Sequence, residues 1–143
     1  MLRTAEAAGI PKLDADELAA GSLTDMSEVL PPKGRTLIAS TPDGTLLGCG
    51  QLRRIREDAV EIKRVFVQPE SQGTGLGRDI FLKLIEEARH MGMAEVYADT
   101  VKGNTSMMRI FERTGFEYID RYPENYNPPE YAPFVVYVRM RLT

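Results

Sequence analysis

The segment Gln68–Ala88, QPESQGTGLGRDIFLKLIEEA, decides the fold prediction because two patterns meet in it. Its first half places three glycines within five residues, at positions 73, 75 and 77. Its second half repeats apolar residues with a helical period, which predicts an amphipathic helix. The apolar stripe of this helix consists of Leu76, Ile80, Phe81, Leu84, Ile85 and Ala88. A glycine-rich turn therefore leads directly into the N-terminus of a helix.

The residues before this turn predict antiparallel strands. Residues 35–40 (RTLIAS) and 45–55 (TLLGCGQLRRI) form a predicted hairpin around the turn TPDG, whose Pro and Gly suit a tight turn. Residues 59–67 (AVEIKRVFV) are rich in β-branched side chains and predict a third strand directly before the glycines. Further upstream, residues 14–20 predict a short helix with carboxylates at its start and a glycine after its end.

The residues after the long helix predict a crossover connection. Gly92 ends the helix, and residues 94–100 (AEVYADT) predict a strand parallel to residues 59–67. Residues 104–114 predict a second helix, and residues 116–122 and 134–142 predict two final strands. Strands grouped in this way exclude a doubly wound sheet, in which strands and helices alternate throughout. We therefore predict an α/β chain of the α+β type, with a mixed, mostly antiparallel sheet flanked by helices on both faces.

Length and composition predict one globular domain, residues 1–143. The chain is 43% hydrophobic and 27% charged, which is ordinary for such a domain. Its net charge of −3 argues against a general nucleic-acid binder, and no apolar run is long enough for a membrane span. The start lacks the apolar region of a secretory signal, and Cys49 is the only cysteine, so we expect a cytoplasmic protein. One histidine and one cysteine do not make a convincing ligand set, so we expect no metal.

A glycine-rich turn at a helix N-terminus predicts an anion site. The amides of the first helical turn lack helical acceptors, the helix dipole favours negative charge, and missing side chains permit close approach. These features favour a phosphate. The turn is not a Walker loop, because Gly77 is followed by Arg78 and Asp79, and Arg78 occupies the third glycine position of a dinucleotide fingerprint. The alternative is that the glycines only shape a tight turn.

Two blocks of this sequence resemble the GNAT superfamily of acetyl-CoA-dependent N-acetyltransferases. Residues 72–77 (QGTGLG) match the family's phosphate loop and follow a strand of the VFVQP type, as they do in the family. Residues 104–116 (NTSMMRIFERTGF) are similar to the family's second block. The resemblance extends from Ala59 to the end of the chain. It implies a GNAT fold and an enzyme that moves an acetyl group from acetyl-CoA, its cosubstrate, to a primary amine of a small molecule or protein.

The resemblance also implies which residues bind acetyl-CoA. The strand before the loop would separate from its parallel neighbour and free backbone groups of Phe66 and Val67 to bond the pantetheine arm. Asn104 would bond the same arm or only cap the second helix, and Phe111 would pack near the sulfur. Arg78 would contact the pyrophosphate or remain solvated. The pyrophosphate would be wrapped by the loop residues Gln72, Gly73, Thr74, Gly75, Leu76, Gly77 and Arg78.

Acetyl transfer to an amine needs a proton acceptor and a proton for the leaving thiolate. Glu61 lies eleven residues before Gln72, where several family members carry a glutamate base; the alternative is a structural ion pair with Lys63. Phe111 occupies the position of the family's proton-donating tyrosine and has no proton to give. The candidate acids are therefore three tyrosines in the loop before the last strand: Tyr122, Tyr126 and Tyr131.

The acceptor site is expected between this loop, YPENYNPPEYAP, and the N-terminal part of the chain. The family normally has a strand and a long helix before the helix predicted at residues 14–20, and only about a dozen residues precede it here. With its N-terminal elements shortened, the site would be open, or a second subunit of a homodimer would close it. The alternative function is a coenzyme-A-binding regulatory module without turnover.

Overall fold

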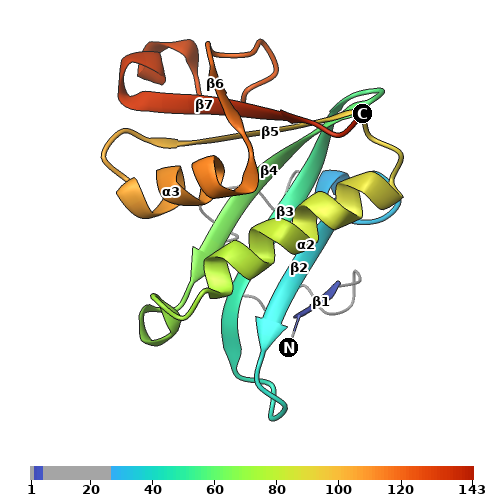
Figure 1. The fold of residues 1–143 in the computed structure, drawn as a ribbon. Coiled ribbons are helices and arrows are strands. Elements are labelled where there is room, and N and C mark those ends of the chain that lie inside the picture. Colours follow the sequence, from blue (N-terminus) through green and yellow to red (C-terminus); the bar gives the residue numbers. More distant parts are fainter. Residues whose placement is uncertain (1, 5–26) are drawn as a thin grey trace.

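The computed structural model describes residues 2–4 and 27–143, which form one sheet with helices packed on it (Figure 1). The helices are α2 (Leu76–His90) and α3 (Thr105–Thr114), with short 3-10 turns η3 (Pro69–Ser71) and η4 (Pro129–Phe134). The strands are β1 (Leu2–Thr4), β2 (Gly34–Ser40), β3 (Leu46–Arg56), β4 (Ala59–Val67), β5 (Glu95–Val101), β6 (Glu117–Ile119) and β7 (Val135–Arg141).

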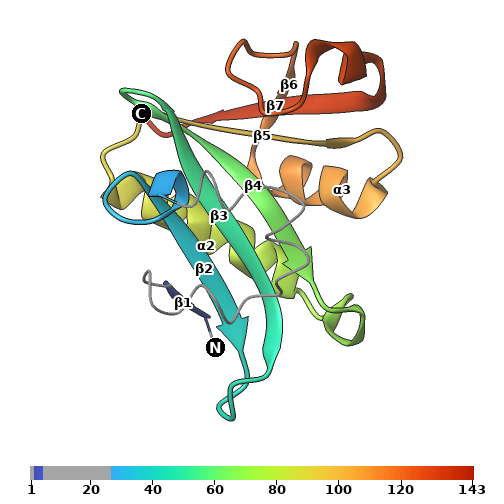
Figure 2. The same cartoon turned by 180° about the vertical axis from the view of Figure 1, so that it is seen from behind.

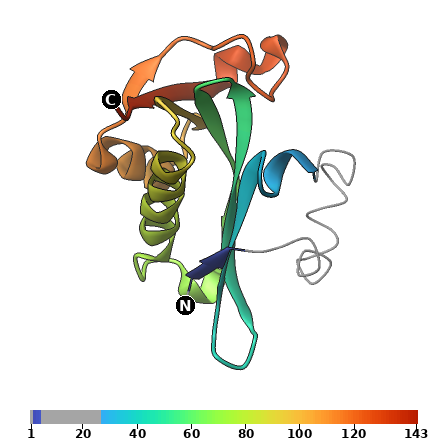
Figure 3. The same ribbon diagram turned by 90° about the vertical axis from the view of Figure 1, so that its right-hand side faces the viewer.

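The sheet has the order β1-β2-β3-β4-β5-β7-β6. Among the described strands, only β4 and β5 pair in parallel, and every other neighbouring pair is antiparallel. The predicted mixed, mostly antiparallel sheet is thus confirmed, as is the crossover through α2. Both described helices lie on the same face of the sheet (Figures 2 and 3). Helices were predicted on both faces, and the helix predicted at residues 14–20 lies outside the described residues.

The core lies between this face of the sheet and the two helices. Ile80, Phe81 and Leu84 of α2 are fully buried, as the apolar stripe predicted. α3 adds Phe111, whose ring centroid lies 5.6 Å from that of Phe81 and 5.8 Å from that of Phe116. Burying an aromatic or aliphatic side chain of this size contributes about 1.5–3 kcal/mol. The stripe therefore fixes the helices against the sheet and determines which face remains for a site.

A bulge bends β4 in the part of the strand that precedes the glycines. Gln51 of β3 pairs with Lys63 and Cys49 pairs with Phe66, so β4 carries one extra residue between these pairs. Arg64, inside the bulge, has a left-handed φ of 50°. Such a bulge kinks its strand and increases the local twist.

β4 and β5 separate immediately before this bulge. Their parallel pairing covers only residues 59–61 of β4 and 95–97 of β5, although both strands continue further. Figure 1 shows the two strands diverging from their paired end toward α3. The separation that the family resemblance implied is confirmed, and it opens a V-shaped gap in the middle of the sheet.

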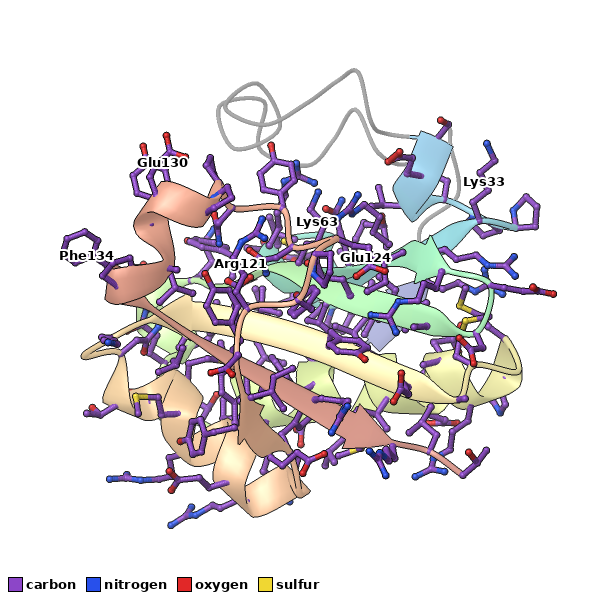
Figure 4. All side chains as sticks on the ribbon, turned by 90° about the horizontal axis from the view of Figure 1, so that it is seen from above. Lys33, Lys63, Arg121, Glu124, Glu130 and Phe134 are labelled. Atoms are coloured by element: carbon purple, nitrogen blue, oxygen red, sulfur yellow. The ribbon has the colours of Figure 1, made fainter. Side chains whose placement is uncertain are left out.

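A loop covers the sheet face opposite α2 near this gap. The strand predicted at residues 116–122 ends at Ile119, and Tyr122 and Asn125 instead bury their side chains under the loop. The Tyr122 ring packs against Tyr97 and Tyr137, with centroid distances of 4.6 and 6.1 Å. Figure 4 looks down on this loop and on η4, from which the exposed Phe134 points outward. We call residues 120–134 the covering loop.

Candidate functional site

The glycine turn and one side of α3 form a surface hollow, which we call the loop hollow. Gly73, Gly75 and Gly77 line it. Gly73 and Gly75 have left-handed φ values of 82° and 90°, a conformation that glycine adopts without strain. Gly75 is the N-cap of α2 and supplies no side-chain cap, so first-turn amides point outward without a helical acceptor. This end of α2 can receive an anion.

Three arginines border the loop hollow. Arg78 lies on α2, and Arg109 and Arg113 lie on α3, one helical turn apart on the same side. All three side chains are exposed. They concentrate positive charge locally on a chain whose net charge is −3. Arg109 and Arg113 were not predicted as site residues, although their spacing of four residues in an amphipathic helix is visible in the sequence.

The remaining predicted loop residues are placed differently. Gln72 lines the hollow, and its Nε2 donates to the carbonyl of Val67 at 3.3 Å. The hydroxyl of Thr74 donates to the carbonyl of Ser71 at 2.5 Å. Leu76 turns its side chain toward the core. Thr74 and Leu76 are not among the residues that line the loop hollow, and their contact with a ligand stays a prediction.

The gap between β4 and β5 forms a second hollow, which we call the strand hollow. It is lined by residues 62–65 of β4 and residues 98–101 of β5. Val65, Asn104 and Met107 line both hollows, so the two are continuous. Val67 borders the loop hollow, whereas Phe66 packs its side chain near Ile38 and Cys49 on the other side of β4.

Asn104 stands where the two hollows meet. Its Oδ1 accepts from the amide of Met107 at 3.2 Å, and its Nδ2 donates to Thr100 Oγ1 at 3.0 Å. The first bond is the predicted N-cap of α3, which is confirmed. The second ties the start of α3 to β5. A contact between Asn104 and a ligand stays a prediction.

Glu61 lies at the closed end of the strand hollow, with only 1% of its side chain exposed. Its Oε1 accepts from Arg53 Nη2 at 3.0 Å. Its Oε2 accepts from the Tyr122 hydroxyl at 2.6 Å, the Tyr126 amide at 3.4 Å and Asn125 Nδ2 at 3.5 Å. Glu61 thus belongs to a buried ion pair that also holds the covering loop.

The ion-pair partner of Glu61 is Arg53 rather than Lys63, which the sequence suggested. Lys63 instead places its Nζ 3.9 Å from the ring centroid of Tyr126, a cation–π geometry. Figure 4 shows Lys63 beside the covering loop. Tyr126 lines the strand hollow with half of its surface exposed, so it meets solvent and the hollow together.

A second carboxylate, Asp99, lines the strand hollow and was missed by the sequence analysis. It lies on β5, two residues beyond the last pair with β4. Its Oδ2 accepts from Asn125 Nδ2 at 2.6 Å, and its Oδ1 accepts from Asn127 Nδ2 at 3.2 Å. Burial raises the pKa of Asp99, and the negative charge of Glu61 raises it further. The available signal was an acidic residue near the end of the predicted strand at residues 94–100.

Two predicted site residues are buried instead of facing the hollows. Tyr122 is 4% exposed, and burial together with the neighbouring Glu61 raises its pKa well above the ordinary value. Its proton points at Glu61, which argues against Tyr122 as a proton donor to a ligand. Phe111 is 0% exposed inside the aromatic core and borders neither hollow, which argues against the predicted contact with the sulfur.

Neither a metal cluster nor a membrane helix is found in the described part of the chain. Among those residues, no three His, Cys, Asp or Glu side chains gather as metal ligands do. The described helices are also too short or too polar to cross a membrane.

Residues 10–116 match the Acetyltransferase (GNAT) family, and the chain therefore belongs to this family of acyltransferases. An uncharacterised N-acetyltransferase of Schizosaccharomyces pombe is 31% identical over 129 residues, which cover 90% of this chain and 74% of the relative. The predicted family and enzyme class are confirmed.

Solved structures share this fold. An acyl-CoA N-acyltransferase-type protein of Klebsiella pneumoniae has a TM-score of 0.79 at 23% identity, covering 100% of this chain and 97% of the other. A Salmonella typhimurium protein solved with its cofactor acetyl-CoA has a TM-score of 0.72 at 20% identity, covering 100% and 94%. At these identities the similarity concerns the fold, and the predicted GNAT fold is confirmed.

Proposed function

We propose that this chain transfers the acetyl group of acetyl-CoA to a primary amine across the gap between β4 and β5. The proposal rests on one observation, which is that the strand hollow is continuous with the loop hollow at the N-terminus of α2. The strand hollow opens where β4 leaves β5, and it runs without interruption into the uncapped N-terminus of α2. A long ligand with phosphates at one end and a thioester at the other fits this combination.

The loop hollow would hold the phosphates. The amides at Gly73, Gly75 and Gly77 offer donors that a pyrophosphate can accept from, as at other helix N-termini. Arg109 and Arg113 add charge from the opposite wall. The chemistry of this donor set suits an anion, and Arg78 joins it as proposed from the family resemblance.

The edge of β4 that faces the gap would hold the pantetheine arm. Phe66 pairs with Cys49 of β3 on one side, and within the described residues β4 has no strand partner on its other side beyond Glu61. An extended arm with amide groups can bond such an edge as an added strand. The thioester would then reach the strand hollow near Asn104.

The amine would approach from the covering loop. Val96 and Ala98 of β5 face the core, so by alternation Tyr97 and Asp99 face the loop side. Acceptor and cosubstrate would therefore meet in the gap from opposite faces of the sheet. Two carboxylates, Glu61 and Asp99, line the gap there. Tyr126 is the loop tyrosine at the hollow and is our candidate donor to the leaving thiolate, with water as the alternative.

Two measurements test this function. Isothermal titration with acetyl-CoA measures binding, and detection of free thiol across a panel of small amines and lysine-containing peptides measures transfer. Binding with thiol release only in the presence of an amine supports the proposal. Binding without release for any amine supports a regulatory coenzyme-A-binding module, which the buried Phe111 at the tyrosine position favours. No binding at all contradicts both. Sedimentation of the same samples tests whether the protein forms a homodimer, one of the two alternatives given for the acceptor site.

A further inference from the structure

We infer that Asp99 is the catalytic proton acceptor of this reaction, and that Glu61 is a positioning residue that holds the covering loop. The inference rests on the proposed acetyl transfer to an amine. It departs from the assignment suggested by sequence spacing, which favoured Glu61. Two carboxylates lie at the same hollow, and their hydrogen bonds distinguish their roles.

The oxygens of Glu61 are already occupied. A carboxylate offers about four lone-pair sites, and Glu61 accepts four hydrogen bonds, from Arg53, Tyr122, Asn125 and Tyr126. Its side chain is 1% exposed. An incoming amine would have to displace a guanidinium or a phenol to reach it. The bonds to Tyr122, Asn125 and the Tyr126 amide instead fix one stretch of the covering loop against β4.

Unlike Glu61, Asp99 can still accept a further hydrogen bond or a proton. Each of its oxygens accepts one bond from a neutral amide, from Asn125 or Asn127, which leaves roughly half of its lone-pair sites available. It lies on the strand edge released by the separation of β4 and β5, and it remains partly exposed to the strand hollow. The two asparagines orient the carboxylate without neutralising it.

The surroundings of Asp99 also suit a base. Burial and the charge of Glu61 raise its pKa, which brings it closer to the value that general-base catalysis favours. The titratable groups that face it are Glu61 and Lys63 on β4, Tyr122 in the covering loop and Tyr137 on β7. Among these, Lys63 acts in the opposite direction and lowers the pKa.

The proton balance of the step is complete. As the amine nitrogen bonds to the acetyl carbon, the carbon–sulfur bond breaks and an N–H proton passes to an oxygen of Asp99. The leaving thiolate takes a proton from Tyr126 or water, and the proton that Asp99 later releases to solvent restores this donor. Asn125 links the two carboxylates because its Nδ2 donates to Asp99 at 2.6 Å and reaches Glu61 at 3.5 Å. Glu61 therefore acts on the base only through the loop and its charge.

The test compares Asp99→Asn, Glu61→Gln and the control Asp58→Asn, an exposed aspartate in the turn between β3 and β4. Each variant is measured for acetyl-CoA affinity, for kcat and kcat/KM against pH with an amine that the unaltered protein acetylates, and for thermal unfolding. Asp99→Asn should lower kcat by about 10²–10⁴-fold, the range of general-base catalysis, with affinity for acetyl-CoA unchanged. Asp58→Asn should match the unaltered protein.

Glu61→Gln gives the discriminating result. It should unfold at a lower temperature, keep more turnover than Asp99→Asn, and shift the acid limb of the kcat/KM profile to lower pH, because one negative charge near Asp99 is gone. Full activity in Asp99→Asn overturns the inference. It is also overturned if Glu61→Gln loses as much turnover as Asp99→Asn with an unshifted acid limb. Absence of acetyl transfer by the unaltered protein overturns the proposed function, and this assignment with it.

Discussion

Replacing Gly77 with glutamate tests the phosphate site with little disturbance to the fold. Gly77 is the second residue of α2, and its φ lies outside the left-handed region. A Cβ added there would lie 3.5 Å from Ile110 Cδ1 and 3.7 Å from Val67 Cγ2, which are ordinary contacts. An acidic side chain in the first helical turn stabilises a helix by about 0.3–1 kcal/mol. The ligand-free variant should therefore unfold at the same temperature or slightly higher.

The added carboxylate should weaken binding by repelling the phosphates. Two unit charges 4 Å apart interact by about 1 kcal/mol in bulk water and about 4 kcal/mol near a protein surface. Since about 1.4 kcal/mol corresponds to a factor of ten, the Kd for acetyl-CoA should rise by roughly 5-fold to 10³-fold. Gly77→Gln is the matched control, because it adds nearly the same volume without charge.

Isothermal titration of both variants at low and high salt gives the comparison. The difference in Kd between the glutamate and glutamine variants isolates the charge term, and it should narrow as salt screens the repulsion. Equal affinities in the glutamate variant and the unaltered protein at low salt would refute the phosphate site at the N-terminus of α2.

Three further predictions concern stability and charge. Tyr122→Phe removes a hydrogen bond to the buried Glu61 and should lower the free energy of unfolding in urea by about 1.5–3 kcal/mol; an unchanged midpoint would contradict the loop-holding role. Phe111→Tyr buries a hydroxyl in an apolar core and should cost about 1–3 kcal/mol in the same assay without accelerating transfer, whereas a faster variant would place residue 111 at the sulfur after all. Arg109→Ala with Arg113→Ala should weaken coenzyme A binding in calorimetry more at low salt than at high salt; a salt-independent change would exclude a charge contact.

Local patterns predicted several elements of this fold closely. The strand read at residues 59–67 has the same bounds as β4, and α2 begins at Leu76, where the apolar stripe begins. Asn104 caps α3 as its residue type indicated. These features follow from side-chain periodicity and capping within a few residues, so they are visible without knowledge of the rest of the chain. The glycine turn likewise identified one end of the site.

The order and pairing of the strands were harder to predict from the sequence. β7 enters the sheet between β5 and β6, and the strand predicted at residues 116–122 keeps only its first part as β6. No local pattern predicted the extra residue of β4 at Arg64, because a bulge is defined by the pairing with β3. Whether two strands remain paired or separate depends on contacts between distant segments, which periodicity does not encode.

The sequence by itself thus determined the helices α2 and α3, the β4 strand and the glycine turn, because each depends on neighbours in the chain. Only the tertiary structure decided which of the two carboxylates, Glu61 or Asp99, keeps lone pairs that are not used in hydrogen bonds. Glu61, Asp99 and Asn125 are distant in sequence, and they meet because β4 lies beside β5 while the covering loop folds over both. Glu61 had the expected spacing from the glycine turn. Its side chain is nevertheless buried, and its carboxylate oxygens already accept four hydrogen bonds. Proton-accepting capacity depends on the partners that surround a group in space, and a linear sequence does not specify them.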